Sequence, residues 1–121
     1  MLTEDESLLK TSVRALVEKE LIPRASYYDQ NEEFPWESLR SISEMGLLGL
    51  TIGEDYGGSR GTYRQFAVVV EELARGCGAT SVVYLAHLSL CTQFIYKYGS
   101  EAQKRKYLSD LVQLRTIGAF A

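Results

Sequence analysis

Three helix-capping motifs constrain the fold of this chain more than any other feature of its sequence. In each, a hydroxyl residue is followed three positions later by Glu or Gln: Thr3 and Glu6, Thr62 and Gln65, Ser100 and Gln103. In such a capping box the hydroxyl accepts a hydrogen bond from the backbone N–H three residues on, and the Glu or Gln reaches back to the backbone N–H of the capping residue. Each motif therefore predicts that a helix begins at the next residue.

Apolar residues three and four positions apart follow each capping box, which is the spacing of one helix face. They are Leu9, Val13, Leu16, Val17 and Leu21 in the first helix, Phe66, Val69, Val70, Leu73 and Cys77 in the second, and Tyr107, Leu108, Leu111, Val112 and Leu114 in the third. Pro23 has no backbone N–H, so we expect the first helix to end or kink near Leu21 and Ile22.

Two further helices are expected between these three. Pro35 favours a helix start, and Gly46 favours a left-handed C-terminal cap. The inner face of the helix between them is expected to carry Trp36, Leu39, Ile42, Ser43 and Met45. The other helix, residues 80–98, is apolar nearly all the way round, which places it at the centre of the bundle. Its most apolar part is about 17 residues long and contains several polar groups, so we do not expect it to span a membrane.

The pattern changes at residues 116–121, which are small and apolar and have no helical period. Such a stretch is typical of a strand, and a lone strand has nothing to pair with in a helical bundle. We therefore expect the sequence to stop inside a longer protein. The predicted fold is all-α, an orthogonal or up-down bundle of about five to six helices. Residues 1–115 would form this helical domain, and residues 116–121 the first strand of a β-domain.

Composition excludes several classes of protein. The chain has 13 basic and 16 acidic residues, so it offers no basic footprint for nucleic acid. The one basic cluster, residues 104–106, is expected to be a solvated helix face. Cys77 and Cys91 are too few for a disulfide framework and are interpreted as buried reduced thiols. The acidic N-terminus has neither the apolar run of a signal peptide nor the Arg-rich character of a presequence, which predicts a cytoplasmic protein.

Few residues could carry chemistry. His87 has no second His or acidic residue within a helix turn, so it is expected to be a packed core histidine rather than a metal ligand. The glycine-rich residues 57–61 lack the spacing of a phosphate loop and are interpreted as a turn. Glu71 and Glu72 point about 100° apart on a helix and are expected on a solvated or salt-bridged surface, with Arg75 as a partner. The residues alone therefore predict no catalytic side chain and no metal site.

Five segments nevertheless form a recognisable series. They are Phe34-Pro35 with Leu39 and Gly-Leu-Leu-Gly-Leu at 46–50, Glu-Asp-Tyr-Gly-Gly at 54–58, Val-Glu-Glu-Leu-Ala-Arg at 70–75, residues 99–108, and Ile-Gly-Ala-Phe-Ala at 117–121. In this order and spacing they resemble the N-terminal helical domain of the acyl-CoA dehydrogenases. The resemblance covers the whole chain. One departure is Gly53, where the family usually has Pro before the turn, and this loosens a loop.

The resemblance implies a flavoprotein oxidoreductase of fatty-acid or branched-chain amino-acid catabolism that oxidises acyl-CoA to 2,3-enoyl-CoA. In this family a carboxylate removes the α-proton, a hydride passes from the β-carbon to N5 of FAD, and the electrons leave to an electron-transferring flavoprotein. The family continues after the position of Ala121 into the β-domain that holds FAD, and a later domain supplies the catalytic glutamate. The 121-residue chain alone is therefore expected to be inactive, and the full-length enzyme to be a homo-oligomer.

The resemblance also assigns site residues. The helix 80–98 helps to wall the acyl-chain cavity in such enzymes, and Val82, Val83, Ala86 and Leu90 are the residues expected nearest to the chain. The residues themselves leave open that these four are plain bundle core. Phe120 and Ala121 match the first positions of the segment that runs along the flavin. They are the only cofactor contacts expected in this chain.

Two hypotheses follow. In the first, the chain is the N-terminal domain of an FAD-dependent acyl-CoA dehydrogenase. In the alternative, it is a free-standing helical interaction or assembly module without catalytic activity. The alternative leaves the expected strand at 116–121 unpaired unless another chain pairs with it.

Overall fold

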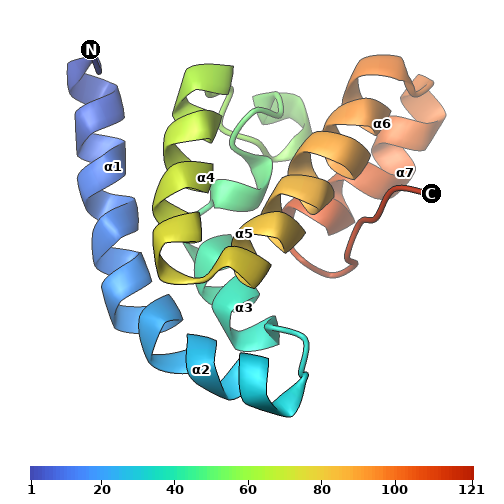
Figure 1. The fold of residues 1–121 in the computed structure, drawn as a ribbon. Helices are drawn as coiled ribbons and strands as arrows, with labels where there is room; N and C mark the ends of the chain where they lie inside the picture. Colours follow the sequence, from blue (N-terminus) through green and yellow to red (C-terminus); the bar gives the residue numbers. More distant parts are fainter.

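The computed structural model describes all 121 residues and consists of helices and their connections. Five continuous helices form the bundle, and two of these contain a π-helical turn (Figure 1). They are Glu4–Asn31 (α1 Glu4–Leu16, π-turn Val17–Leu21, α2 Ile22–Asn31), α3 Trp36–Glu44, α4 Tyr63–Gly76, Gly78–Tyr98 (α5 Gly78–Leu85, π-turn Ala86–Thr92, α6 Gln93–Tyr98) and α7 Glu101–Val112. Two short 3₁₀ turns, Leu47–Gly49 and Glu54–Tyr56, lie between α3 and α4. The predicted all-α bundle is confirmed.

The three capping boxes are formed as the sequence predicts. The hydroxyls of Thr3, Thr62 and Ser100 accept from the backbone N–H three residues on, and the Glu or Gln at that position accepts from the capping residue's N–H. As a result α1, α4 and α7 begin at the residue after each cap. The left-handed cap expected at Gly46 is also present, with a φ of 77°.

Helices α1 and α4 lie side by side and run in the same direction (Figure 1). Their alignment is fixed by ion pairs at three levels: Arg64 with Glu6, Arg14 with Glu72, and Arg75 with Glu18. Between the helices lies one apolar core, in which the apolar stripes of α1 and α4 pack against α3, α5 and the 3₁₀ turn after α3. Its fully buried members include Val13, Val17, Leu21, Leu39, Ile42, Leu48, Val69, Leu73 and Tyr84.

The kink expected before Pro23 is present, and the helix continues beyond it. The π-turn Val17–Leu21 lies at this point, and Figure 1 shows α2 turning away from α1. Pro23 directly follows this π-turn, in which the backbone N–H of Ile22 donates to the oxygen of Val17, five residues back. The missing N–H of Pro23 thus falls where the hydrogen-bond pattern changes from π to α. The chain therefore stays helical to Asn31, a segment that the sequence analysis did not assign to a helix.

The prediction that the helix over residues 80–98 lies at the centre of the bundle is wrong for one of its faces. Tyr84, His87 and Leu88 are buried, but the opposite side, with Val82 and Leu90, is exposed. The bundle supplies partners for one side only, so the other apolar side stays open. By length and composition Gly78–Tyr98 could cross a membrane, contrary to the expectation, although core helices of soluble proteins meet the same criterion.

Three side chains expected on inner faces are also exposed, namely Trp36, Met45 and Tyr107. Trp36 lies in the first turn of α3 and stacks on Phe34, with ring centroids 4.6 Å apart, instead of entering the core. The buried positions of α3 are Ser38, Leu39 and Ile42.

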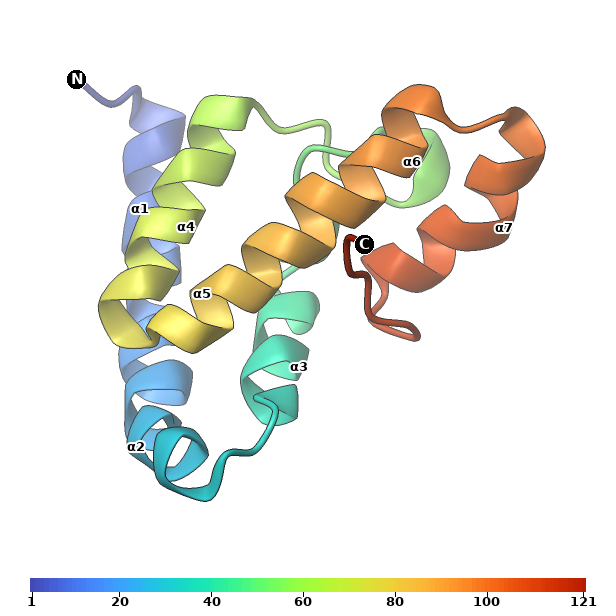
Figure 2. The same cartoon turned by 45° about the vertical axis from the view of Figure 1, so that its right-hand side comes forward.

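Residues 116–121 do not form the expected strand in this structure, because no second strand is present to pair with them. They run as an extended segment beside α5, α6 and α7 (Figure 2). That they begin a flavin-binding domain stays a prediction.

Candidate functional site

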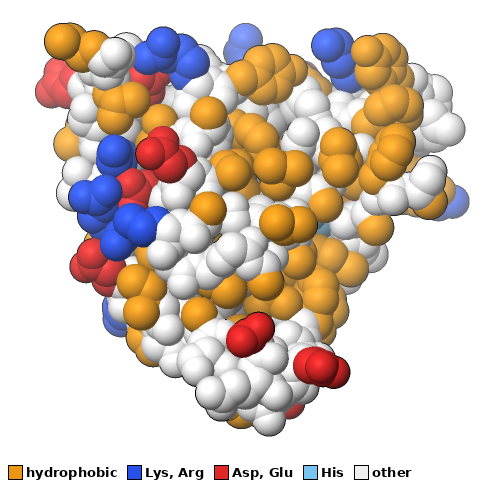
Figure 3. Space-filling model, viewed as in Figure 1, with side chains coloured by type: hydrophobic (Ala, Val, Ile, Leu, Met, Phe, Trp, Pro, Cys, Tyr) orange, Lys and Arg blue, Asp and Glu red, His pale blue; other side chains and the backbone are white.

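The most prominent surface feature is a row of exposed apolar side chains along the helix Gly78–Tyr98. Figure 3 shows hydrophobic side chains gathered along the diagonal that this helix follows. The row consists of Val82, Leu85, Leu90, Phe94 and Tyr98, together with the half-buried Ala86. We call these six residues the apolar row.

The π-turn Ala86–Thr92 keeps the apolar row on one side of the helix. Each residue of an α-helix advances by about 100°, so Tyr98 would lie about 160° around an uninterrupted helix from Val82. A π-turn accommodates one extra residue, which reduces this separation to about 60°. The row can therefore face a single partner along its whole length.

The four residues expected near the acyl chain divide between the two sides of the helix. Val82 and Leu90 are 66% and 42% exposed, and Ala86 lies between them in the apolar row. Val83 is half-buried and packs against the core. The interpretation as plain bundle core thus fits Val83 but does not fit Val82 or Leu90.

The two residues expected at the flavin lie at the exposed end of the C-terminal segment. Phe120 is 66% exposed, and Ala121 is exposed as well. The segment is held on the back of the apolar helix, because the backbone N–H of Gly118 donates to Nδ1 of His87 at 2.9 Å. The structure therefore holds the segment that leads to Phe120 against the buried side of the helix that carries the apolar row.

His87 is a buried, hydrogen-bonded core histidine, as predicted. Its Nε2 lies 2.8 Å from the backbone oxygen of Leu111 on α7. Burial lowers the pKa of His87, which favours the neutral ring. Sequence reasoning missed its role in holding residues 117–119, because that contact joins positions 31 residues apart.

The glycine-rich residues 57–61 form a turn, as predicted. Their backbone N–H groups donate to backbone oxygens of residues 49–54, at 2.6 to 3.0 Å. The donors that a phosphate would need are therefore already used. A Cβ on Gly58 would lie 2.1 Å from the backbone oxygen of Ile52, so only glycine fits this close approach.

The prediction that both Glu71 and Glu72 lie on the surface is wrong for Glu72. This residue is 2% exposed and accepts hydrogen bonds from Arg14 of α1 and Arg75 of its own helix. The partnership with Arg75 is the expected one. The burial follows from Arg14, which lies 58 positions away in the sequence and closes over the carboxylate.

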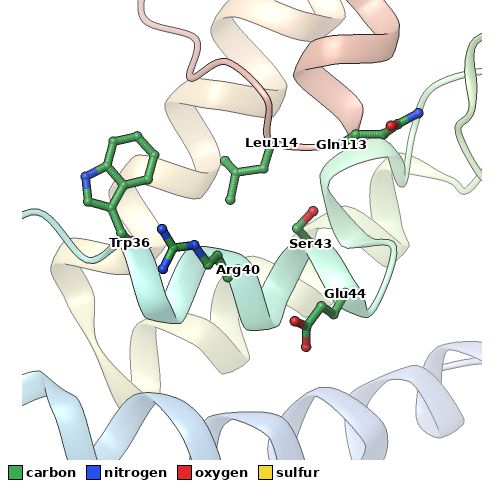
Figure 4. A pocket seen from close by; sticks show the side chains of 6 residues that line it. All are labelled: Trp36, Arg40, Ser43, Glu44, Gln113 and Leu114. Carbon is green, nitrogen blue, oxygen red and sulfur yellow. The ribbon is translucent and has the colours of Figure 1, made fainter.

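A separate hollow of about 480 Å³ lies between α3 and the turn after α7 (Figure 4). Its lining residues are Trp36, Arg40, Ser43, Glu44, Gln113 and Leu114. The guanidinium of Arg40 lies beneath the Trp36 ring, and it also pairs with Glu37. The hollow is open to solvent and contains no nucleophile beside a base, so it does not have the features of a catalytic site.

Three members of the apolar row were not predicted from the sequence as site residues: Leu85, Phe94 and Tyr98. The sequence does contain a pattern that indicates the row, since apolar residues recur every four positions from Val82 to Tyr98. In a regular α-helix, however, residues four apart move around the axis by about 40° at each step, so this pattern does not predict a single row.

Comparison with known proteins places these features in a family. The family model described as "Acyl-CoA dehydrogenase, N-terminal domain" matches residues 3–115. A short-chain specific acyl-CoA dehydrogenase of Clostridium acetobutylicum is 38% identical over 98% of this chain and 31% of its own length. The chain thus spans about a third of the length of the curated relatives that it matches.

Two solved structures have the same fold. The glutaryl-coenzyme A dehydrogenase in its glutaryl-CoA complex superposes with a TM-score of 0.91 and 34% identity, over 98% of this chain and 31% of that chain. An acyl-CoA dehydrogenase of Bacillus anthracis complexed with FAD has a TM-score of 0.89 and 25% identity, over 97% of this chain and 20% of that chain.

Proposed function

This chain belongs to the acyl-CoA dehydrogenase family, as its N-terminal domain, and from this premise we propose that it works in an FAD-dependent enzyme that converts acyl-CoA to 2,3-enoyl-CoA. Its part is to wall one side of the acyl-chain pocket and to supply one edge of the flavin site. FAD, when bound, supplies the acceptor for the electrons that leave the acyl chain. The alternative of a free-standing helical module is not favoured, because the match to a dehydrogenase domain covers nearly the whole chain.

The observation that carries this proposal is the apolar row on Gly78–Tyr98. Exposed apolar surface of this extent is costly in water unless a partner covers it. A row that one π-turn keeps on a single side suits a long, narrow apolar partner such as an acyl chain. Val82, Ala86 and Leu90 would contact the chain, exclude water from it and limit the space beside it.

The C-terminal segment fits the edge of a flavin site. Phe120 offers an exposed aromatic face, and the backbone N–H groups of residues 120 and 121 donate to no other part of the chain. These groups could therefore contact a planar ring with hydrogen-bonding atoms at its rim. A buried site needs converging groups from several sides, so these two residues would form only part of it.

The main test uses the polypeptide as purified from its source. We expect flavin absorbance, bleaching of that absorbance when a short acyl-CoA is added, and reduction of an artificial electron acceptor. The 121-residue chain, purified separately, should give none of these signals. A natural polypeptide without flavin and without acyl-CoA-dependent reduction would refute the proposal.

Substitutions test the role of the apolar row. Val82→Phe enlarges a side chain beside the proposed chain path, and we expect kcat/KM for the longest accepted acyl-CoA to fall by about tenfold or more, since pocket fit of this kind discriminates by that amount. Leu8→Phe on α1 is the matched control, because Leu8 is 61% exposed and lies on a different helix. Equal effects of the two changes would argue against the assignment.

The remaining parts of the proposal concern partners and location. As the resemblance implies, we propose an electron-transferring flavoprotein as the electron acceptor and a homo-oligomeric enzyme. We further propose a cytoplasmic protein that is not inserted in a membrane. The buried side of Gly78–Tyr98 supports this, since Tyr84 and Ser81 donate to backbone oxygens of Leu47 and Val70 and so tie the helix into the bundle. Cell fractionation of the natural polypeptide tests its location, and sedimentation tests its oligomeric state.

A further inference from the structure

His87 is a buried titratable side chain that binds two segments outside its own helix. Both of its ring nitrogens face backbone atoms of other segments: the N–H of Gly118 lies 2.9 Å from Nδ1, and the oxygen of Leu111 lies 2.8 Å from Nε2. The side chain is fully buried. It thus bridges the apolar helix, α7 and the C-terminal segment.

The chemistry of these partners fixes the state of the ring. A backbone N–H can only donate and a backbone carbonyl can only accept. Nδ1 must therefore carry a lone pair, and Nε2 must carry the proton. A doubly protonated ring would place an N–H against the N–H of Gly118 and lose that bond. The arrangement requires the neutral Nε2–H tautomer.

Two more contacts hold the segment at the same place. A Cβ on residue 118 would lie 2.6 Å from both Cβ and Sγ of Cys91, so the backbone approaches the helix more closely than any residue but glycine would allow. The backbone of Ala119 lies within hydrogen-bonding reach of the Cys91 thiol. Residues 118 and 119 are therefore held on the helix by neighbouring turns.

The position of His87 links the two predicted site regions. It is next in sequence to Ala86 of the apolar row, so their Cα atoms are about 3.8 Å apart. Phe120 is two residues beyond Gly118, and two extended residues span about 7 Å at most. His87 therefore lies on the helix that carries the apolar row and holds the C-terminal segment two residues before Phe120.

We infer that His87 is a positioning residue: in its neutral Nε2–H tautomer it clamps Gly118 to the apolar helix and so sets the place of Phe120 and Ala121 relative to the acyl-chain wall. This inference rests on the proposed function for the identity of what the two regions bind. The clamp itself rests only on the contacts of His87 and Gly118.

Two substitutions separate the clamp from simple core packing. His87→Phe keeps a ring in the same space but removes both hydrogen bonds. His87→Asn is smaller, but its side-chain oxygen can take the place of Nδ1 and accept from Gly118. A residue that only fills volume would tolerate Phe better than Asn, whereas a clamp requires the opposite order.

The first experiment is NMR on the ¹⁵N-labelled 121-residue chain. We expect the His87 ring to show the Nε2–H tautomer and the Gly118 amide to be protected from hydrogen exchange. The amide should exchange about tenfold faster in His87→Phe and close to the parent rate in His87→Asn, the loss expected for one hydrogen bond. An Nδ1–H tautomer, or an unprotected Gly118 amide in the parent chain, would overturn the inference without any use of the variants.

The second experiment uses the purified flavin-containing polypeptide. We expect His87→Phe to shift the visible flavin spectrum and weaken flavin retention, and His87→Asn to restore both. A flavin spectrum and retention unaffected by His87→Phe would overturn the positioning role. A parent polypeptide that holds no flavin would instead refute the proposed function, while the exchange data would still report on the clamp.

Discussion

Replacing Glu72 by Gln should destabilise the protein by about 2 kcal/mol. Glu72 is 2% exposed, between α1 and α4, and its carboxylate is enclosed by basic groups. Arg14 donates to it twice, at 3.1 and 2.8 Å, and Arg75 donates at 3.3 Å. Lys10 lies 3.8 Å away. Gln keeps the shape of the side chain, so the change removes the charge and leaves no cavity.

The magnitude follows from the exposure of the partners. Removing one member of a fully buried ion pair costs about 3 to 5 kcal/mol, because the other charge is left without compensation. Here the side chains of Arg14 and Arg75 are 48% and 41% exposed, so water can solvate them when the carboxylate is lost. The cost should therefore lie below that range but above the roughly 1 kcal/mol of an exposed pair.

The same contacts set a pH dependence. Hydrogen bonds from Arg14 are the main cause that holds the pKa of Glu72 below its usual 4.5; burial opposes them, and Arg75 adds to the lowering. The hydrogen bond from Arg64 likewise lowers the pKa of Glu6 to about 2. A carboxylate with a depressed pKa stabilises the fold above 4.5, and this stabilisation is lost as the pH falls toward the folded-state value. Stability should therefore fall between pH 4.5 and about 2.

Urea unfolding followed by circular dichroism, at pH 7 and at pH 3, measures both effects. We expect Glu72→Gln to lose stability at pH 7 and to show a shallower fall between the two pH values than the parent chain. Glu71→Gln is the matched control, since Glu71 is the exposed neighbour, and it should change stability by less than about 0.5 kcal/mol. Equal losses for the two variants would refute the reasoning.

Two further substitutions test the core and the glycine turn. Tyr84→Phe removes a buried hydroxyl that donates to the backbone oxygen of Leu47 at 2.9 Å, so we expect a loss of about 1 kcal/mol, seen as a fall in Tm of about 4 °C; an unchanged Tm would contradict this. Gly58→Ala would place a Cβ 2.1 Å from the backbone oxygen of Ile52 and should cost more than about 3 kcal/mol in urea unfolding. Gly78→Ala meets no atom within 4 Å and should be neutral or stabilising, so similar losses at both glycines would rule out the steric argument.

Local chemistry explains why the helix starts were predictable. Thr3, Thr62 and Ser100 each need only residues within three positions to form their caps, and the sequence contains all of these. The apolar stripes of α1 and α4 were predictable for a similar reason, since a 3.6-residue period places Val13 and Leu73 on inner faces without reference to the partner.

Contacts between distant segments explain what was missed. The sequence presents Glu71 and Glu72 as equivalent neighbours, and only Arg14 of another helix decides which of them is buried. The helix beyond Pro23 was missed because a proline normally ends a helix, whereas here the π-turn directly before Pro23 allows the helix to continue. The tautomer of His87 likewise depends on Gly118 and Leu111, both far from it in sequence.

The apolar row differs from these cases, because the sequence contains the pattern that indicates it, but the pattern gives a single row only if the helix is not a regular α-helix. Apolar residues four apart spiral slowly around a straight α-helix, so from Val82 to Tyr98 they suggest a helix that is apolar all round and hence central. A π-turn converts the same spacing into a single row, and the structure has one at Ala86–Thr92. A sustained four-residue spacing in an otherwise apolar helix thus has two interpretations: a core helix, or a one-sided surface with a π-turn. The exposure of the side chains on the two sides of the helix distinguishes these interpretations. Val82 is 66% exposed and Tyr84, on the opposite side, is fully buried, which favours the one-sided surface. Such a helix is covered on one side by its own bundle and leaves its other side open, which is the arrangement that the proposed wall between a domain core and an acyl chain requires.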